Sequence, residues 1–440
     1  MKFCLVNPAW RFEHSTYFGC PETHLPLEFL FARQHLQAAG HDVLLVDAHL
    51  EGLDPAAATR RVAAFAPDFL AVTTAPTYLF WRCPQPELTV PAAWLRTLRA
   101  ALPGKVTTVA VGPHASATPR ATGEKLGCDV VLRGECDLAL AQLAAQPWEQ
   151  IPGCCWRTAP GWRLDPRQAQ VAMEQLTALD FHDYPLARRH HRHHVFSGAG
   201  RGAELEFSRG CPWNCTFCNK SLFRNKFRER TVEAVLQEAE TLLRHGVTYV
   251  YFIDEIFGAG RRSAALLQGL ADLPLQFGMQ TRIDLWDEDS LAALGRAHCI
   301  SLECGIESIT PEGRERFRKG CRLPNQRLEH LLRIARTHIP WVQANLIAAD
   351  PDQPDATPEA IARWRQELIA AGIWVSQPVP VFAFPGSPLY TQKFGIPDDL
   401  AWERAHDHYL AANAERNYSD IQDATPLPLV QLEKARKRSA

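Results

Sequence analysis

The sequence predicts an α/β protein in which an N-terminal doubly wound (Rossmann-like) parallel sheet is followed by a partial β/α (TIM-like) barrel. Residues 1–145 and 203–397 both alternate short apolar runs with amphipathic stretches. Continuous apolar runs indicate strands buried on both faces, as in parallel sheets covered by helices. Residues 146–202, rich in Trp, Pro, Gly and Arg, predict a linker with a short hairpin at "GCCWRTAPGWRL".

The first block contains about five strand–helix units. The expected strands are 2–8, 42–48, 68–75, 106–112 and 129–134, and the expected helices are 26–40, 54–66, 91–102 and 136–145. Doubly wound sheets bind ligands at the carboxyl ends of their strands. We therefore expect a binding edge in the loops that follow the strands, which are Asn7–Phe12, Asp47–Gly52, Thr73–Tyr78, Gly112–Thr118 and Arg133–Glu135.

The second block contains six strand candidates with helical segments between most of them. These strands are expected at 203–208, 247–255, 275–284, 299–308, 341–350 and 374–384. The clearest helix follows Thr231, a plausible N-cap, and stops at Gly246. Six strands with interleaved helices indicate a partial or complete β/α barrel. Residues 398–440 predict a helical tail whose basic end, "KARKRSA", indicates a solvated segment.

Composition narrows the classes of function. The 46% share of hydrophobic residues suits a globular protein with a large core, and the net charge of −2 argues against nucleic acid and anionic membranes as partners. No apolar run approaches the ~18 residues of a membrane span. Residues 1–12 lack the apolar region of a secretory signal, so we expect a cytoplasmic protein. In that reducing compartment, clustered cysteines predict metal or redox ligands rather than disulfides.

The stretch "SRGCPWNCTFCNK", residues 208–220, places Cys211, Cys215 and Cys218 within eight residues. A structural zinc site needs four ligands, usually from two paired hooks, and no second hook stands nearby. Three thiolates can instead hold three irons of a [4Fe–4S] cluster and leave the fourth iron open for chemistry. The alternative is a zinc site completed by a histidine such as His245.

This loop resembles that of the radical S-adenosylmethionine (SAM) superfamily, in which a CxxxCxxC motif with an aromatic residue before the last cysteine follows the first barrel strand. The segments "YFIDEIF", "ECGIES" with "EGRERFRKG", and "AFPGSPLY" resemble motifs that follow later strands in that superfamily. The resemblance implies that the open iron chelates SAM and that an electron from the cluster releases a 5′-deoxyadenosyl radical. Such a radical abstracts hydrogen from an unactivated carbon, and the protein supplies binding and positioning.

The resemblance also implies residues that bind SAM. Asp254 or Glu255 would accept a hydrogen bond from the methionyl ammonium, and Arg282 could pair with the carboxylate in a bidentate fork. Glu307 could bond the ribose hydroxyls. The adenine would meet the backbone of Phe217 and Asn219. The acidic residues and Arg282 could also be strand-end ion-pair residues.

The first block resembles the cobalamin-binding domain that precedes the barrel in one class of that superfamily. The similar segments are "HLPLEFLFARQHLQAAGHDVLLVDA", "AVGPHASATP" and "GCDVVLRGECDLAL". The resemblance implies a corrin on the carboxyl ends of the sheet, across from the cluster. The implied corrin contacts are Asn7, Pro8, Thr73, Thr74, Ala75, Gly112, Pro113, His114, Arg133, Gly134 and Glu135. The alternative is a sheet that no longer binds a corrin.

We interpret neither of two histidine patterns as a metal site. "DAHLEG" matches the DxHxxG pattern whose histidine coordinates cobalt in other enzymes, but it follows the second strand rather than the first. We interpret the match at His49 as accidental. The run His190–His194 lies among arginines that would repel a cation, which indicates a solvated or interface segment.

The leading hypothesis is a cobalamin-dependent radical SAM methyltransferase acting on a small metabolite or natural-product intermediate. It implies an electron donor such as flavodoxin or ferredoxin, and we expect a monomer or a weak homo-oligomer. One alternative keeps the cofactors but not methyl transfer, as in a cyclase, a rearranging enzyme or an oxidoreductase. The other is a non-catalytic cobalamin or iron–sulfur sensor.

Overall fold

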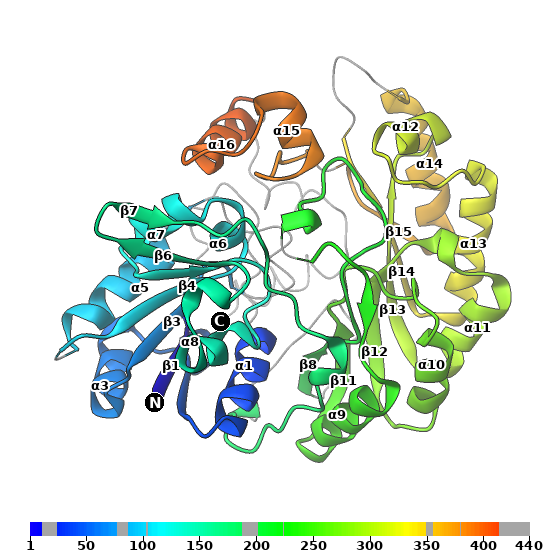
Figure 1. Ribbon diagram of the computed structural model, residues 1–440. Coiled ribbons are helices and arrows are strands. Elements are labelled where there is room, and N and C mark those ends of the chain that lie inside the picture. The colour runs from blue at the N-terminus through cyan, green and yellow to red at the C-terminus, as the bar shows by residue number, and fades with distance from the viewer. Residues whose placement is uncertain are drawn as a thin grey trace, which may run out of the picture.

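The computed structural model describes residues 1–10, 24–76, 87–102, 104–186, 201–222, 224–348, 355–378 and 380–412. Two α/β units lie side by side, one built on each block of the sequence (Figure 1). The histidine run and the basic end of the tail lie outside the described residues.

The N-terminal sheet has seven strands in the order β2-β1-β3-β4-β5-β6-β7. They are β1 (Lys2–Asn7), β2 (Asp42–Asp47), β3 (Phe69–Thr73), β4 (Thr107–Val111), β5 (Val130–Leu132), β6 (Cys154–Thr158) and β7 (Gly161–Arg163). The first five are parallel, as predicted. The predicted hairpin forms as β6 and β7, and β6 pairs antiparallel with β5. It therefore extends the sheet rather than lying apart in a linker.

Helices cover both faces of this sheet (Figure 1). They are α1 (Leu27–Ala38), α2 (Ala48–Glu51), α3 (Pro55–Phe65), α5 (Thr89–Ala100), α6 (Pro113–Ala117), α7 (Pro119–Leu126) and α8 (Ala139–Ala145). Alternate residues of β1 enter different cores, Phe3 and Leu5 on one side and Cys4 and Val6 on the other. This alternation follows from the two-residue period of a strand, and it explains why apolar residues run through β1 without a break.

The second sheet has six parallel strands that neighbour one another in chain order. They are β8 (Arg201–Leu205), β11 (Val247–Phe252), β12 (Gln276–Thr281), β13 (Cys299–Glu307), β14 (Trp341–Leu346) and β15 (Trp374–Val375). The intervening helices include α9 (Val232–Arg244), α10 (Ser263–Ala271), α11 (Glu288–Arg296), α12 (Pro311–Arg316), α13 (Asn325–His338) and α14 (Pro358–Ala370). Thr231 caps α9 as predicted, because its side chain accepts from the Ala234 amide. The arrangement is a partial β/α barrel.

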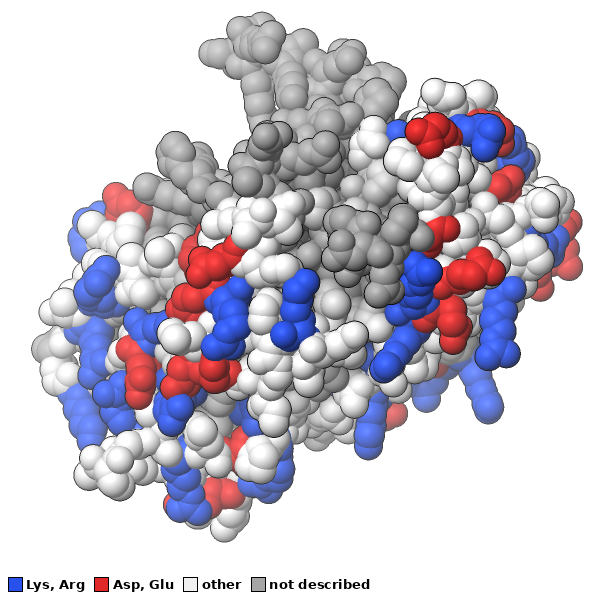
Figure 2. Space-filling view, turned by 90° about the horizontal axis from the view of Figure 1, so that it is seen from above, with Lys and Arg blue, Asp and Glu red and all other residues white. Residues whose placement is uncertain are grey.

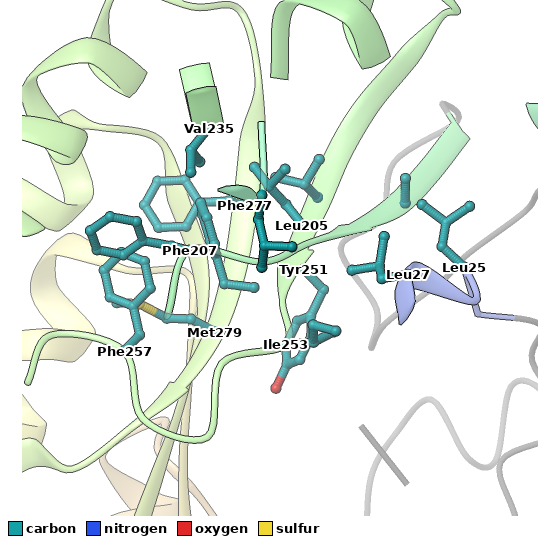
Figure 3. Close-up of a cluster of buried hydrophobic side chains, with 14 of the residues drawn as sticks. Leu25, Leu27, Leu205, Phe207, Val235, Tyr251, Ile253, Phe257, Phe277 and Met279 are labelled. Carbon is teal, nitrogen blue, oxygen red and sulfur yellow. The ribbon is translucent and has the colours of Figure 1, made fainter. Parts of the chain in front are cut away.

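The two units share one hydrophobic core. Leu25 and Leu27, from the N-terminal unit, lie beside Leu205 and Ile253 of the barrel (Figure 3), and all four are fully buried. Burial of apolar surface between the units stabilises their relative placement. The carboxyl ends of the two sheets are therefore held in a fixed relation.

The last described segment contacts both units, through Leu389 at the cysteine loop and through Trp402 at α6. Helices α15 (Pro388–Phe394) and α16 (Ala401–Ala412) lie above α6 and α7 (Figure 1). Trp402 of α16 packs its ring 4.1 Å from the ring of His114 in α6, and Arg120 pairs with Asp399 at 2.6 Å. Residues 401–412 are thus helical, as predicted for the tail.

Candidate functional site

The cysteine loop follows β8 and the short strand β9 (Ser208–Arg209), at the carboxyl end of the barrel sheet. Cys211, Cys215 and Cys218 are partly exposed, whereas the other described cysteines are all buried. The predicted ligands are thus the described thiols to which an added group has access.

Contacts from three other segments fix the backbone of this loop. Gly210 has a φ of +82°, and a Cβ at this position would lie 2.2 Å from the Lys226 carbonyl oxygen. The Thr216 amide donates to the Phe317 carbonyl at 2.9 Å, and the Thr216 carbonyl accepts from the Leu389 amide at 2.8 Å. The "EGRERFRKG" and "AFPGSPLY" segments therefore hold the cysteine loop directly.

The two acidic residues after β11 have different places. Asp254 is fully buried, and its carboxylate accepts from the amides of Phe207 at 2.9 Å and Ser208 at 2.8 Å. Burial raises the pKa of Asp254 to about 7, against the hydrogen bonds that lower it. Glu255 reaches the cysteine loop instead and accepts from the Gly210 amide at 2.8 Å. Asp254 therefore secures the end of β8, and Glu255 stands closer to the thiols.

Arg282, predicted to meet the SAM carboxylate, already makes a bidentate pair. Its Nε and Nη2 donate to the two carboxylate oxygens of Asp284 at 3.0 and 2.6 Å. Its Nη1 donates to the Lys319 carbonyl at 2.5 Å, and its guanidinium carbon lies 4.2 Å from the ring centroid of Trp213. In this arrangement Arg282 orients Trp213, the residue midway between the first two cysteines.

Glu307 lies at the end of β13 with an unusual backbone. Its φ is +67°, and the pairing register with β14 shifts between Gly305 and Glu307. Such irregularities at a strand end re-aim a side chain, and they cluster at functional sites. Its carboxylate pairs with Lys319 Nζ at 3.0 Å. Lys319 could not be singled out from the sequence, because its proximity to the loop depends on the turn after α12.

The chemistry around the thiols suits an anionic group. Burial raises the pKa of the Cys211 thiol, and among the nearby charges Lys220 opposes this shift most strongly. Burial raises the pKa of the Cys215 thiol to about 11, and there Lys319 is the charge that most opposes the shift. Lys220 also donates to the Cys211 carbonyl. Three partly exposed thiols among buried cations fit a cluster that takes them as thiolates.

The zinc alternative is not supported. Among the described residues, no three His, Cys, Asp or Glu side chains are placed to hold one metal ion. The His245 carbonyl accepts a hydrogen bond from Arg201, which is the first residue of β8. The cysteine loop follows the opposite end of that strand, after its last residue. The histidine is therefore at the wrong end of the strand. A cluster avoids this constraint, because each thiol binds a different iron.

Asn219 provides a test for a bound nucleoside. It is 1% exposed, and its Oδ1 atom has no hydrogen-bond partner among the described residues. A buried, unsatisfied amide oxygen is costly and fits a donor such as an adenine amino group. Phe217, two residues before it, meets Phe317 edge to face with 5.6 Å between ring centroids.

At the N-terminal sheet, the strand order reverses between β1 and β3, which is where ligands bind in such folds. Asn7, beside Pro8 at the end of β1, donates to Asp47 at 2.8 Å and accepts from Trp10 at 2.9 Å. Tyr184 donates to Asp47 at 2.5 Å. The aspartate of the "DAHLEG" match is thus engaged within the fold.

The end of β3 fits a polar ligand better than the ends of β1 and β2 do. Thr73 donates to the Ala75 carbonyl at 2.7 Å. Thr74 is 2% exposed, and its hydroxyl has no partner among the described residues. A Cβ on Gly112, after β4, would lie 2.5 Å from that hydroxyl, so the backbone approaches closely here. The unsatisfied hydroxyl at this strand end is consistent with a corrin or another polar group.

The other predicted corrin contacts make contacts within the protein. Arg133 donates to the carbonyls of Ser116 at 3.1 Å and Asp165 at 2.7 Å. A Cβ on Gly134 would lie 2.4 Å from the Ala169 carbonyl oxygen. Pro113 is at the start of α6, and His114 is fully buried against Trp402. A corrin role for these residues stays a prediction.

Glu135 and its neighbour Asp137 join the two units. Fully buried Arg209 donates to both carboxylate oxygens of Asp137 at 2.8 Å and to Glu206 at 2.9 Å. Glu135 pairs with Arg228. These contacts bring the end of β5 against the end of β8. The sequence could not pair Arg209 with a residue 72 positions away.

The edge of the N-terminal sheet therefore lies next to the cysteine loop. Helix α6, which follows β4, contacts the 3₁₀ turn Lys220–Leu222, which follows the third cysteine. Viewed from above, the described surface carries Lys and Arg side chains interspersed with Asp and Glu (Figure 2). On this face the described residues thus create no broad field of one sign.

These features define a class of protein, an α/β chain with three accessible thiols at the end of a partial barrel beside a doubly wound sheet. Residues 205–364 match the family model of the radical SAM superfamily. The chain therefore carries a radical SAM domain, as the cysteine loop predicted.

Full-length comparisons extend the similarity beyond that domain. The uncharacterized methyltransferase PH0819 of Pyrococcus horikoshii is 23% identical over 91% of this chain and 84% of its own length. The hopanoid C-3 methylase of Methylococcus capsulatus is 28% identical over 81% and 67%. The radical SAM methyltransferase TsrM of Kitasatospora setae, solved with cobalamin and a [4Fe–4S] cluster, superimposes with a TM-score of 0.67 at 19% identity over 88% and 76%. The predicted two-unit fold is thereby confirmed. Within the described ranges, no helix is both long and apolar enough to cross a membrane.

Proposed function

We propose that the chain is a cobalamin-dependent radical SAM methyltransferase that modifies an unactivated carbon of a small molecule. The observation that carries the proposal is the placement of three accessible thiols next to the carboxyl edge of a doubly wound sheet. A [4Fe–4S] cluster bound there would supply the electron that cleaves SAM, and a cobalamin on the sheet would supply a methyl carrier.

Cys211, Cys215 and Cys218 would hold the cluster. Gly210 and the backbone contacts of Thr216 keep the loop in shape. These contacts order the loop before the cluster binds, so less conformational entropy is lost on binding.

Residues around the loop would bind SAM. Glu255, nearer the loop than Asp254, would accept from the ammonium, and Glu307 would accept from the ribose hydroxyls. Asn219 would accept from the adenine amino group beside Phe217. Arg282 would act mainly by orienting Trp213, because its fork is occupied by Asp284.

Thr74 and the backbone at Gly112 are the best-supported contacts for a corrin, because the buried Thr74 hydroxyl has no hydrogen-bond partner in the part of the chain that the structure describes. The shared core and the Arg209–Asp137 pair would fix the distance between corrin and cluster. A rigid relation between two reacting groups lowers the entropic part of a reaction barrier.

The names of the relatives favour methyl transfer over the other radical outcomes. PH0819 and the hopanoid C-3 methylase are both named for methyl transfer. TsrM has also been solved with a tryptophan substrate and a SAM analogue, which supports a small-molecule substrate. An electron donor such as flavodoxin or ferredoxin completes the proposal.

The test measures two SAM-derived products. The anaerobically reconstituted chain is incubated with hydroxocobalamin, SAM and a chemical reductant, and products are quantified by mass spectrometry. We expect both S-adenosylhomocysteine, from methyl transfer, and 5′-deoxyadenosine, from reductive cleavage. Deoxyadenosine alone would favour a cyclase or oxidoreductase, and neither product would favour a sensor.

A matched pair of variants controls this test. Replacing Cys211, Cys215 and Cys218 together by Ala should abolish deoxyadenosine formation. Replacing Cys321, which is 5% exposed, by Ala should leave both products.

A further inference from the structure

Two buried cations lie against the cysteine loop. Lys319 is 3% exposed and Arg282 is 4% exposed. Both reach the loop from outside it, Arg282 from the end of β12 and Lys319 from the turn after α12. Because solvent screens buried charges weakly, each acts strongly on whatever charge the loop carries.

The two cations differ in how far their charge is balanced. Arg282 forms a two-point pair with Asp284, so its positive charge is largely compensated on the spot. Among the described residues, Lys319 Nζ donates one hydrogen bond, to Glu307 at 3.0 Å.

The turn that carries Lys319 is built onto the loop. The Phe317 carbonyl accepts from Thr216, next to Cys215. Gly320 has a φ of +68°, and a Cβ there would lie 3.2 Å from the Trp213 ring. The Lys319 carbonyl is held by Arg282. The main chain on both sides of Lys319 is therefore tied to the loop, and Glu307 accepts from its ammonium at 3.0 Å.

We propose that Lys319, balanced by Glu307, sets the reduction potential of the cluster held by the three cysteines. The inference rests on the proposed function, since it needs the cluster to be present. Reduction adds one electron, supplied in the experiment below by dithionite, and makes the cluster more negative by one unit. A buried cation nearby stabilises the reduced form and raises the potential, whereas a buried anion lowers it.

The test is a redox titration of the full chain with its cluster, without SAM, followed by electron paramagnetic resonance. Lys319→Gln should shift the midpoint potential to more negative values. Glu307→Gln should shift it in the opposite direction, because it leaves Lys319 uncompensated. The control is Lys105→Gln, which removes an exposed lysine of the N-terminal unit and should not move the midpoint.

Lys319→Arg separates charge from shape and should restore the wild-type midpoint. If Lys319→Gln takes up no iron while Lys319→Arg does, the charge requirement is supported through cluster binding instead. Equal midpoints for Lys319→Gln and Lys105→Gln, or shifts of the same sign for Lys319→Gln and Glu307→Gln, would overturn the inference. A wild-type chain that binds no cluster would overturn the proposed function itself.

Discussion

At Gly210, the backbone decides whether the cysteine loop can form. Its φ lies in the left-handed region, and a side chain would strike the Lys226 carbonyl. A non-glycine residue there meets both conformational strain and a steric clash with main chain. The loop that carries the thiols therefore requires a glycine, which has no Cβ, immediately before Cys211.

We expect Gly210→Ala to reduce the iron bound per chain after reconstitution and to lower the melting temperature. The matched control is Gly127→Ala, which has a similar φ of +65° but no atom within 4 Å of its added Cβ. The Gly127→Ala control should lower the free energy of unfolding by about 1–2 kcal/mol through backbone strain alone, and it should keep its iron. Equal iron binding by the two variants would contradict the importance of the close contact at Gly210.

Single residues were predictable where their chemistry is local. Cys211, Cys215 and Cys218 were predicted as ligands from their spacing, and the structure leaves them accessible; their binding of a cluster stays a prediction. The environment of Arg282 was missed although Asp284 is only two residues away, because the fork depends on how the strand ends. The Arg209–Asp137 pair could not be found, since nothing local links the two positions.

At the scale of elements, capping and strand composition explain what forms. Thr231 starts α9 by accepting from the Ala234 amide at 3.2 Å, as its sequence position indicated. The last barrel strand is shorter than predicted and ends at Val375. Pro378 and Pro380 follow, and prolines cannot donate to a sheet ladder. The hairpin formed as predicted, but its pairing with β5 depends on tertiary packing.

Removing the cap of α9 should have a local and measurable cost. Thr231→Ala should lower the free energy of unfolding by about 1 kcal/mol, and Thr231→Ser should retain most of the stability that the cap contributes. Thermal melting compares the two variants, and their iron content should stay equal to that of the wild type. A loss of iron in Thr231→Ala alone would show that the cap also supports the cysteine loop.

At the scale of the whole molecule, a buried charge network joins the two units. Its members are Arg209, Arg224, Arg228, Glu28, Glu135, Asp137 and Glu206. Among the described residues, four carboxylates thus face three guanidiniums. Burial raises the pKa of Glu28 to about 8, whereas the arginines hold the pKa values of Asp137 and Glu206 below their ordinary range although burial alone would raise them. The surplus carboxylate therefore keeps a proton at neutral pH.

This proton makes stability depend on pH in a defined direction. Because the folded chain holds the Glu28 proton more tightly than the unfolded chain, its contribution is full below about pH 4.5 and is lost as pH rises through about 8. Glu28→Gln needs no proton, so its melting temperature should gain on the wild type as pH rises from 5 to 8. The exposed Glu240 provides the control variant, Glu240→Gln. A difference that stays constant over this range would contradict the protonated state of Glu28.

The most direct test of the whole account is the cofactor content of the chain after anaerobic reconstitution with iron, sulfide and hydroxocobalamin. The account predicts about four irons and four sulfides per chain together with one corrin. In the Cys211, Cys215 and Cys218 triple Ala variant, the iron should be lost and the corrin kept, because the two groups would lie on separate units. A triple variant that keeps its iron, or a wild-type chain that binds no corrin, would contradict the central claim.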